Sequence, residues 1–299
     1  MASGVLSREP RSANGKITLN IRRVLIYAVL IILTLMCLFP IWILLVNMTR
    51  SHGDISTSFS LWFGTYLVQN TKNAMAQSNI KIAQSLLNSL FISFFSSVLC
   101  VYFSALTAYA IHIYNFKGKE IVFNFILLIM MIPTQVSALG FIQMVTGWET
   151  AMNVRNQFWP LILPSISSPI TFFFMKQYME STLPFEMVEA GRVDGANELR
   201  IFHTLVLPIM LPALAVQFIF SFVSSWNNLF VPSMLLNGDI TRETIPMVIA
   251  KFTDSSNPIN FDLGQVYVAM GYAVLPPIIV YLIFSRFIIK GMTAGAVKG

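Results

Sequence analysis

Charged side chains are scarce in this chain of 299 residues. Asp, Glu, Lys and Arg together make up 11% of the sequence, whereas about a quarter is usual for a soluble domain. Hydrophobic residues reach 56%, and the mean hydropathy is +0.70. This composition excludes an ordinary water-soluble domain with one large core and indicates an integral membrane protein surrounded by a lipid bilayer.

Cysteine is almost absent, and basic residues do not cluster. Cys37 and Cys100 each lie inside an apolar run, so their spacing predicts neither a metal site nor a disulfide framework. The net charge of +6 comes from bases scattered singly between apolar blocks, with no basic face. Nucleic acid is therefore excluded as a partner, and the positive excess is interpreted as a signal of membrane topology.

The signatures of several enzyme and carrier classes are also missing. The sequence contains no Gly-Lys-Ser/Thr phosphate loop and no His-Glu-x-x-His. No acid or base falls within a predicted span, although membrane-embedded enzymes and ion-coupled carriers usually need such groups. Both classes are disfavoured. A transporter of this composition would need energy from a separate ATP-hydrolysing protein.

Long uncharged blocks dominate what the chain does contain. A helix needs about 20 apolar residues to cross a bilayer. Six blocks of this kind occur, at 24–48, 86–111, 121–145, 158–175, 209–236 and 264–285. The sequence therefore predicts an all-α integral membrane protein with six transmembrane helices.

Lys and Arg are divided unequally between the two sides of these blocks. Thirteen of the 19 bases fall in the N-terminal segment, the second and fourth connections and the C-terminus. Because cytoplasmic segments carry the excess of Lys and Arg, both termini are predicted to be cytoplasmic. The predicted organisation is an N-terminal segment 1–23, a membrane domain 24–290 and a C-terminal tail 291–299.

The connection at 176–205 is the most charged and holds five of the 13 acidic residues. Pro184 is typical of a helix start. Phe185, Val188 and Val193 are spaced as one apolar stripe of a short helix. This connection is either a solvated linker with an interfacial helix or a docking surface for a cytoplasmic partner, and periodicity alone leaves both alternatives open.

A turn is predicted in the middle of this connection. Asp194-Gly195 should end the first helix, because glycine readily adopts the backbone angles of a turn. Gly195 is expected to have a positive φ or to lie against another backbone. A second helical stretch is predicted from about Asn197 to Leu207.

The run EAGRVDGANELRIFHTLVLPIMLP, at 189–212, resembles the signature loop of permeases of binding-protein-dependent ABC importers. The matching positions are Glu189, Ala190, Asp194, Gly195, Ala196, Phe202, Leu207, Pro208 and Pro212. Gly191 departs from the pattern, since that family usually has alanine there, but both residues are small and little effect is expected.

Further similarities extend over most of the chain. Asn88-Ser89, MMIP at 130–133 and Trp226-Asn227 are similar to family positions, whereas Gly140 stands where proline is common. The tail GMTAGAVKG at 291–299 resembles the end of the smaller permease in the carbohydrate-uptake, maltose-type subfamily. This resemblance implies a multi-pass protein of the bacterial inner membrane.

The resemblance also implies an assembly. Its members would be a second homologous permease, a homodimer or heterodimer of ATPase subunits, and an extracytoplasmic solute-binding protein. ATP and Mg would bind to the ATPases, so this chain would hold no cofactor and no metal and would not be an enzyme. The short cytoplasmic helix between spans four and five would be the coupling helix, with ATPase contacts at Glu189, Ala190, Asp194, Gly195 and Ala196.

Two smaller interpretations concern the tail and the solute path. Gly291, Gly295 and Lys298 either belong to a frayed terminus or reach the ATPases, as the resemblance suggests. Neutral polar residues inside the spans, Gln135, Gln143, Asn227 and Asn228, could hydrogen-bond a sugar, but helix packing uses the same residue types. An importer of glycerol phosphate or another non-sugar solute and, in a different class, an ion-coupled carrier remain alternatives.

Overall fold

In the computed structural model, the protein is described over residues 13–147, 154–236, 238–253 and 262–296, and every regular element in these ranges is helical. This confirms the predicted helical fold. The elements are α1 (Ala13–Met48), α2 (His52–Thr57), α3 (Leu67–Ala76), α4 (Ile82–Ile113), α5 (Lys119–Met130), α6 (Thr134–Gly147), α8 (Trp159–Ile162), η1 (Leu163–Ile166), α9 (Pro169–Thr182), α10 (Phe185–Val193), α11 (Glu198–Ile201), η2 (Phe202–Val206), α12 (Leu207–Trp226), α13 (Phe230–Leu235), α14 (Ile245–Thr253) and α15 (Leu263–Ala296).

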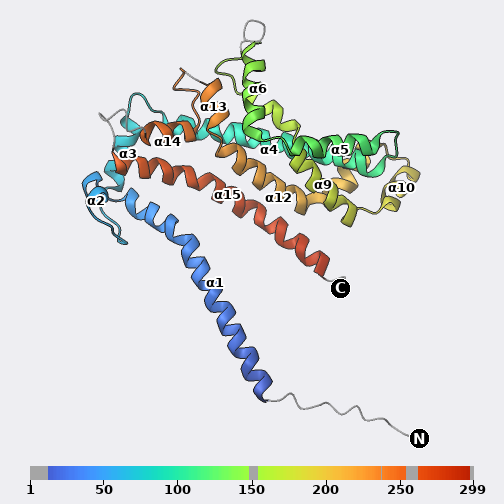
Figure 1. The fold of residues 1–299 in the computed structure, drawn as a ribbon, viewed down its shortest axis with the longest axis horizontal. Coiled ribbons are helices and arrows are strands. Elements are labelled where there is room, and N and C mark those ends of the chain that lie inside the picture. Colours follow the sequence, from blue (N-terminus) through green and yellow to red (C-terminus); the bar gives the residue numbers. More distant parts are fainter. Residues whose placement is uncertain (1–12, 148–153, 237, 254–261, 297–299) are drawn as a thin grey trace.

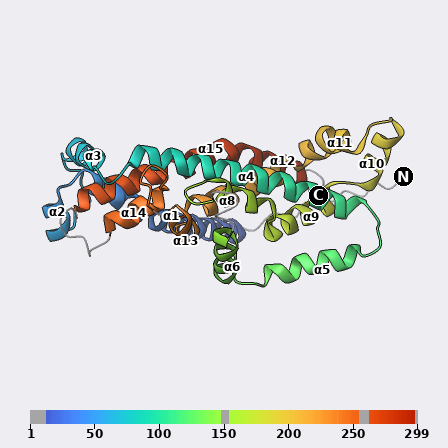
Figure 2. The same cartoon turned by 90° about the horizontal axis from the view of Figure 1, so that it is seen from above.

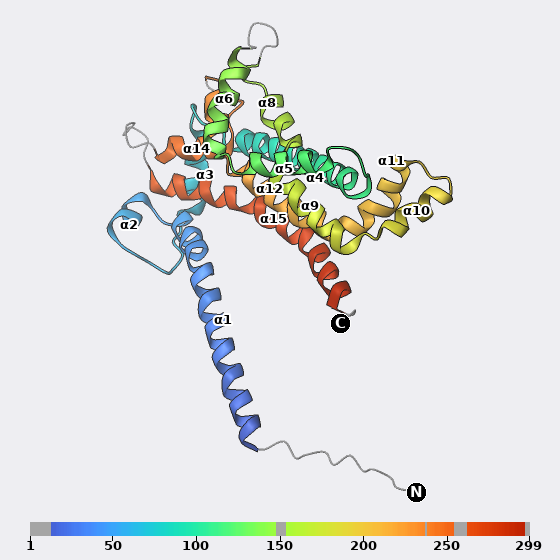
Figure 3. The same cartoon turned by 45° about the vertical axis from the view of Figure 1, so that its right-hand side comes forward.

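Helices α4, α9, α12 and α15 form an elongated bundle (Figure 1). Its core contains the fully buried side chains of Met175, Met179, Phe202, Met210 and Phe222. Helices α2, α3 and α14 lie at one end of the bundle, and α10 and α11 lie at the other (Figure 2). Most of α1 stands away from the bundle and exposes its apolar side chains (Figure 3). This separation of the two ends suits a chain that lies across a membrane.

Four continuous helical segments are long and apolar enough to cross a membrane: Arg23–Met48, Ile82–Ile113, Glu198–Trp226 and Leu263–Ile288. Three of them match the first, second and sixth predicted blocks. A fifth candidate exists if α5 and α6 together form one broken span.

The third predicted block is not one straight helix. The axes of Lys119–Met130 and Gln135–Gly147 differ by 99°. Pro133 lies at the break, where it has no N–H to donate and its ring opposes a continuous helix. The prediction of a single helix over 121–145 is therefore wrong at the MMIP sequence.

The fourth and fifth blocks also differ from prediction. Residues 158–175 are divided into α8, the 3-10 helix η1 and the start of α9, because prolines at 160, 164 and 169 interrupt the hydrogen-bond ladder. The fifth helical run begins at Glu198 and ends at Trp226, ten residues short of the predicted end at 236. Asn228 helps to separate α12 from α13, since its Oδ1 accepts a hydrogen bond from the Val231 N–H at 3.3 Å.

α15 continues through Pro276 and Pro277, although proline usually kinks or breaks a helix. Pro277 has no N–H, so the carbonyl of Ala273, four residues earlier, lacks its usual helical donor. The indole Nε1–H of Trp226 on α12 donates to that carbonyl at 3.1 Å. A side chain from the neighbouring helix thus replaces the lost hydrogen bond, as helices in lipid require.

The C-terminal end of α1 is fastened to α3 and α15. The buried Asn70 of α3 donates from Nδ2 to the Met48 carbonyl at 3.0 Å and to the Arg50 carbonyl at 2.8 Å. Gly264 of α15 lies directly against the Asn70 amide, because a β-carbon on Gly264 would be 2.6 Å from Asn70 Nδ2. These groups join three helices at the end of the bundle opposite α10.

Candidate functional site

The connection between α9 and α12 forms two short helices with a tight turn. Pro184 is the N-cap of α10, and Asp194 is its C-cap. Gly195 has φ +77°, which confirms the predicted positive φ. The Gly195 N–H donates to the Arg192 carbonyl at 2.9 Å, and the Ala196 N–H donates to the Gly191 carbonyl at 3.1 Å. This pair of bonds is a Schellman motif, which closes a helix through a left-handed glycine.

An ion pair holds the turn in place. Arg192 Nε lies 2.7 Å from Glu198 Oε1, and the Tyr109 hydroxyl of α4 donates to Glu198 Oε2 at 2.8 Å. The hydrogen bond to Glu198 raises the pKa of the Arg192 guanidinium, so the pair stays charged at physiological pH. Both side chains are about one-third exposed, with relative areas of 33% and 39%. The pair therefore contributes less than about 1 kcal/mol to stability, and its role is to orient the turn.

The back of α10 packs closely on the start of the next helical run. Val188 is fully buried, and Gly191 faces Ile201 and Leu205. A β-carbon on Gly191 would lie 3.2 Å from Ile201 Cγ1 and 3.2 Å from Leu205 Cδ1, so even alanine would require these side chains to shift by a few tenths of an ångström. Glycine at 191 therefore allows this close approach.

Several apolar side chains of this connection are exposed. Val193 is 87% exposed and Leu199 of α11 is 62% exposed, and both Phe185 and Met187 are also exposed. They lie on different sides of α10, because Phe185 and Met187 are about 160° apart around the helix. The prediction that Phe185, Val188 and Val193 form one stripe is wrong, because Val188 and Val193 lie about 140° apart. Exposed apolar side chains in so charged a connection are typical of a surface that contacts a partner.

The predicted ATPase contacts lie on or beside this surface. Glu189, Ala190, Asp194 and Gly195 are exposed, and Ala196 is half-buried. In the predicted tail, Gly291 and Gly295 fall inside α15, which extends to Ala296. Lys298 lies outside the described residues.

The four predicted solute contacts do not form one group. Gln135 and Gln143 are exposed on α6, and neither lines the cavities to which Asn227 and Asn228 contribute. Asn227 is the C-cap of α12 and lines a cavity of 540 Å³ beside α14 and α15. Asn228 lies between α12 and α13 and lines a second cavity.

This second cavity lies between α4, the η1–α9 connection and α12, and its lining is partly polar, with apolar atoms forming the larger share. Its volume is 510 Å³. The lining includes hydroxyl groups from all three elements and the amides of two side chains: Ser96, Ser165, Ser167, Ser168, Thr171, Ser221, Ser224, Ser225, Gln217 and Asn228. The remaining lining residues are Cys100, Leu161, Pro164, Pro169, Ile170 and Phe220, so none of the lining side chains is charged.

Most of this polar lining was missed by sequence reasoning, although one signal for it was present. On α12, positions 217, 221, 224 and 225 are polar in an otherwise apolar run, and position 228 follows just beyond its end. Their spacing of three and four residues places them on one face of a helix. Such a stripe predicts a polar-lined face inside the membrane but does not say which helices complete the cavity.

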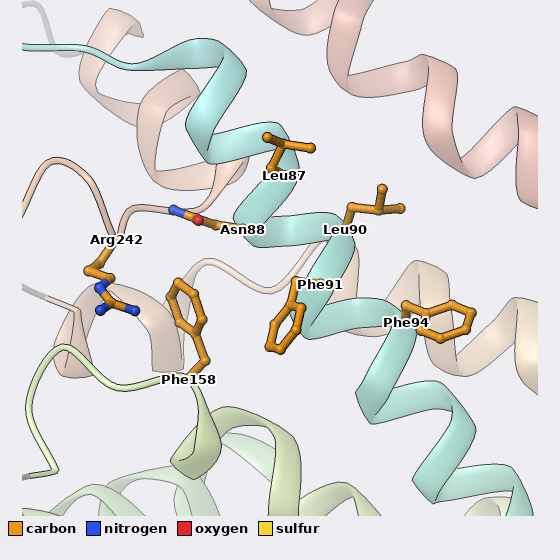
Figure 4. A pocket seen from close by; sticks show the side chains of 7 residues that line it. All are labelled: Leu87, Asn88, Leu90, Phe91, Phe94, Phe158 and Arg242. Atoms are coloured by element: carbon orange, nitrogen blue, oxygen red, sulfur yellow. The ribbon is translucent and has the colours of Figure 1, made fainter.

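A third hollow has a different character. It has a volume of 710 Å³ and is lined by Leu87, Asn88, Leu90, Phe91, Phe94, Phe158 and Arg242 (Figure 4). The Arg242 guanidinium carbon lies 5.1 Å from the centre of the Phe158 ring. Asn88 is not free, because its Nδ2 donates to the carbonyls of Thr241 and Glu243 at 2.8 and 2.9 Å. This groove is mainly apolar and suits hydrocarbon better than a polar solute.

The Asn88-Ser89 pair has a structural role in this fold. Besides the two bonds of Asn88, the Ser89 hydroxyl accepts a hydrogen bond from the Ile245 N–H at 2.8 Å. Together they attach the segment before α14 to the start of α4.

Comparisons with known proteins agree with this architecture. Residues 101–294 match the family model described as "Binding-protein-dependent transport system inner membrane component". The chain is 32% identical over 212 residues to the arabinooligosaccharides transport system permease protein AraQ of Bacillus subtilis, covering 71% of this chain and 72% of AraQ. It is 28% identical over 286 residues to the trehalose/maltose transport system permease protein MalG of Thermococcus litoralis, covering 93% and 98%.

A solved structure shares the fold. It is the crystal structure of a bacterial ABC transporter involved in the import of the acidic polysaccharide alginate. The match has a TM-score of 0.72 at 19% sequence identity, and it covers 93% of this chain and 99% of that chain. At this identity the likeness concerns the fold alone.

Proposed function

The chain belongs to the family of binding-protein-dependent transport system inner membrane components, and from this premise we propose that it is a permease subunit of an ATP-driven carbohydrate importer. The observation that carries the coupling part of the proposal is the α10–α11 turn. It is fixed at its back by Val188 and the Arg192–Glu198 pair, and the apolar side chains of Phe185, Met187, Val193 and Leu199 are exposed. A surface of this kind fits a groove on a partner protein.

In this proposal, the partner in contact with α10 is an ATPase subunit. ATP and Mg bind to the ATPases, and this chain holds neither. A second homologous permease supplies the other half of the translocation path, and an extracytoplasmic binding protein delivers the solute. Closure of the ATPase dimer displaces α10, and the continuous helical run from Glu198 to Trp226 transmits this displacement to the bundle.

The proposed assembly predicts where ATP hydrolysis occurs. The purified chain alone should hydrolyse no ATP, because its sequence contains no phosphate-binding Gly-Lys-Ser/Thr loop. The complex with ATPase, second permease and binding protein should hydrolyse ATP faster when maltose, trehalose or an arabinooligosaccharide is added. ATP hydrolysis by the isolated chain, or a complex stimulated by glycerol 3-phosphate and by none of these carbohydrates, would contradict the proposal.

We also propose six membrane crossings with both termini in the cytoplasm. The 13-to-6 division of basic residues supports this orientation. The third crossing would then run through the bent pair α5–α6, and the fourth through α8, η1 and α9. Broken helices of this kind are tolerated where the exposed backbone groups face protein or a water-filled cavity.

Reporter fusions test the proposed topology. Fusions after Phe116 and Met179 should report a cytoplasmic location, and fusions after Ser60 and Asn153 should report the outside. A cytoplasmic signal at Asn153 alone would show that 119–147 enters and leaves the membrane on the same side. A cytoplasmic signal at Ser60 would invert the whole arrangement.

A further inference from the structure

We propose that the cavity between α4, the η1–α9 connection and α12 is a binding site for an uncharged, polyhydroxylated solute, with the Gln217 amide as its central hydrogen-bonding group. This inference rests on the proposed function and adds that the subunit itself contacts the transported carbohydrate. Of the four solute contacts predicted from sequence, Asn228 lines this cavity, whereas Gln135, Gln143 and Asn227 do not.

The Gln217 side chain is buried but has no hydrogen-bond partner in the described chain. The residue is 6% exposed and lies within α12, in a part of the chain that is otherwise apolar, and it lines the cavity. The amide is accessible from the cavity and is not among the sealed, unpartnered polar atoms of the described chain. Water or a solute in the cavity can therefore hydrogen-bond it.

Three serines follow Gln217 on the same face of α12. Ser221, Ser224 and Ser225 line the cavity, and within the described chain their hydroxyls have no hydrogen-bond partner. Helical hydroxyls commonly bond the preceding turn, as Ser97 and Thr107 on α4 do, donating to carbonyls four residues earlier at 2.6 and 2.8 Å. Ser93 and Ser104 on α4 also lack a partner within the described chain, but their oxygens are buried, whereas the α12 serines line the cavity. The α12 hydroxyls therefore remain available to a solute.

The cavity lining combines polar and apolar side chains. Leu161, Ile170 and Phe220 add apolar surface beside the hydroxyl and amide groups. A sugar presents both hydroxyls and C–H faces, so it matches this mixture. A volume of 510 Å³ lies within the range of about 300–1,000 Å³ that is typical of small-molecule sites.

The same lining opposes a phosphorylated solute. Among the described residues, no lysine, arginine or histidine lines the cavity, so a phosphate would lack a charged partner there. The N-terminus of α9 borders the cavity, but its cap is already made, with Ser168 Oγ accepting from the Thr171 N–H at 3.4 Å. The site therefore favours a neutral carbohydrate over glycerol phosphate.

Uptake by the reconstituted complex tests the role of Gln217. Gln217→Leu preserves side-chain size but removes both amide groups, so solute uptake should fall about tenfold, the equivalent of losing roughly 1.4 kcal/mol of hydrogen bonding. ATP hydrolysis stimulated by the liganded binding protein should stay within about twofold of the wild type, because α10 is untouched. Gln177→Leu, at an exposed position of α9 outside the cavity lining, is the matched control and should change neither rate.

A chemical protection experiment tests the cavity without changing Gln217. Ser224→Cys is introduced into a chain whose native cysteines are replaced, Cys37 by serine and Cys100 by alanine, and is labelled in the complex with a small water-soluble thiol reagent. The carbohydrate that the complex transports should slow labelling several-fold, and glycerol 3-phosphate should not. This experiment decides the matter if Gln217→Leu fails to assemble.

The outcomes separate this inference from the proposed function. If the wild-type complex takes up no carbohydrate, the proposed function fails, and the inference fails with it. If it takes up maltose or an arabinooligosaccharide, but Gln217→Leu is as active as the wild type and labelling of Ser224→Cys is unprotected, only the binding site is wrong. Reduced uptake with intact ATP hydrolysis, together with protection, supports it.

Discussion

Gly195→Asp should abolish solute-stimulated ATP hydrolysis by the complex while the chain remains inserted in the membrane at normal levels. Gly195 has φ +77°, and a β-carbon in the left-handed region costs about 1–2 kcal/mol. The two hydrogen bonds that close α10, at 2.9 and 3.1 Å, depend on this conformation. The new carboxylate would also stand beside Asp194 on the surface proposed to enter the ATPase.

The position itself is uncrowded, so the defect should lie in docking and not in folding. A β-carbon on Gly195 would meet no atom within 4 Å. Gly118 is a matched control, because it has φ +92° and equally open surroundings but lies in the turn between α4 and α5. Gly118→Asp introduces the same strain and charge away from α10 and should preserve stimulated hydrolysis.

A second variant separates the effect of backbone strain at position 195 from the effect of the added negative charge. Asparagine tolerates the left-handed region better than most residues. Gly195→Asn should therefore retain part of the stimulated hydrolysis that Gly195→Asp loses. Normal uptake by a well-expressed Gly195→Asp variant would remove the coupling role of this turn and leave a simple linker.

Gly264→Val should strongly destabilise the end of the bundle where α1, α3 and α15 meet. A β-carbon at this position would lie 2.6 Å from Asn70 Nδ2, which no real contact allows. Asn70 cannot simply move aside, because its Nδ2 donates to the Met48 and Arg50 carbonyls. Overpacking costs about 1–3 kcal/mol, and each orphaned buried carbonyl adds about 1–3 kcal/mol.

Thermal unfolding of the detergent-solubilised chain measures this effect. The apparent Tm of Gly264→Val should drop by on the order of 5 °C or more relative to the wild type. Gly140→Val is the control, since it makes the same change within α6, where a β-carbon meets nothing within 4 Å. Equal Tm values for the two variants would show that the contact of Gly264 with Asn70 is not tight in the protein.

Local features of the chain were predictable from sequence, and the α10 turn is the best example. Pro184 acts at the start of α10, and Asp194 and Gly195 act at its end. Each affects only its immediate neighbours, so the caps and the positive φ follow from elementary backbone preferences. Which side of α10 packs against the protein was not predictable in the same way. Val193 is apolar but exposed, because its neighbours in space are decided by the fold and not by α10.

Features that join distant segments could not be predicted. The continuation of α15 past Pro277 depends on Trp226, which is 47 residues from its acceptor Ala273. The tight fit of Gly264 depends on Asn70, which is far away in sequence. The polar stripe of α12 was readable from its spacing, but its facing partners Ser96 and Thr171 come from other helices.

The hydrogen bond between Trp226 and Ala273 limits how the subunit can change shape. If α12 slid along α15 by one residue, about 1.5 Å, the indole would move away from the carbonyl that Pro277 leaves without a helical donor. We therefore expect α12 and α15 to move as one rigid body during transport. The π-helical turn Phe202–Val206 is the one change of helix type on the run from Glu198 to Trp226, so we expect any bend between this body and α10 to occur at that turn.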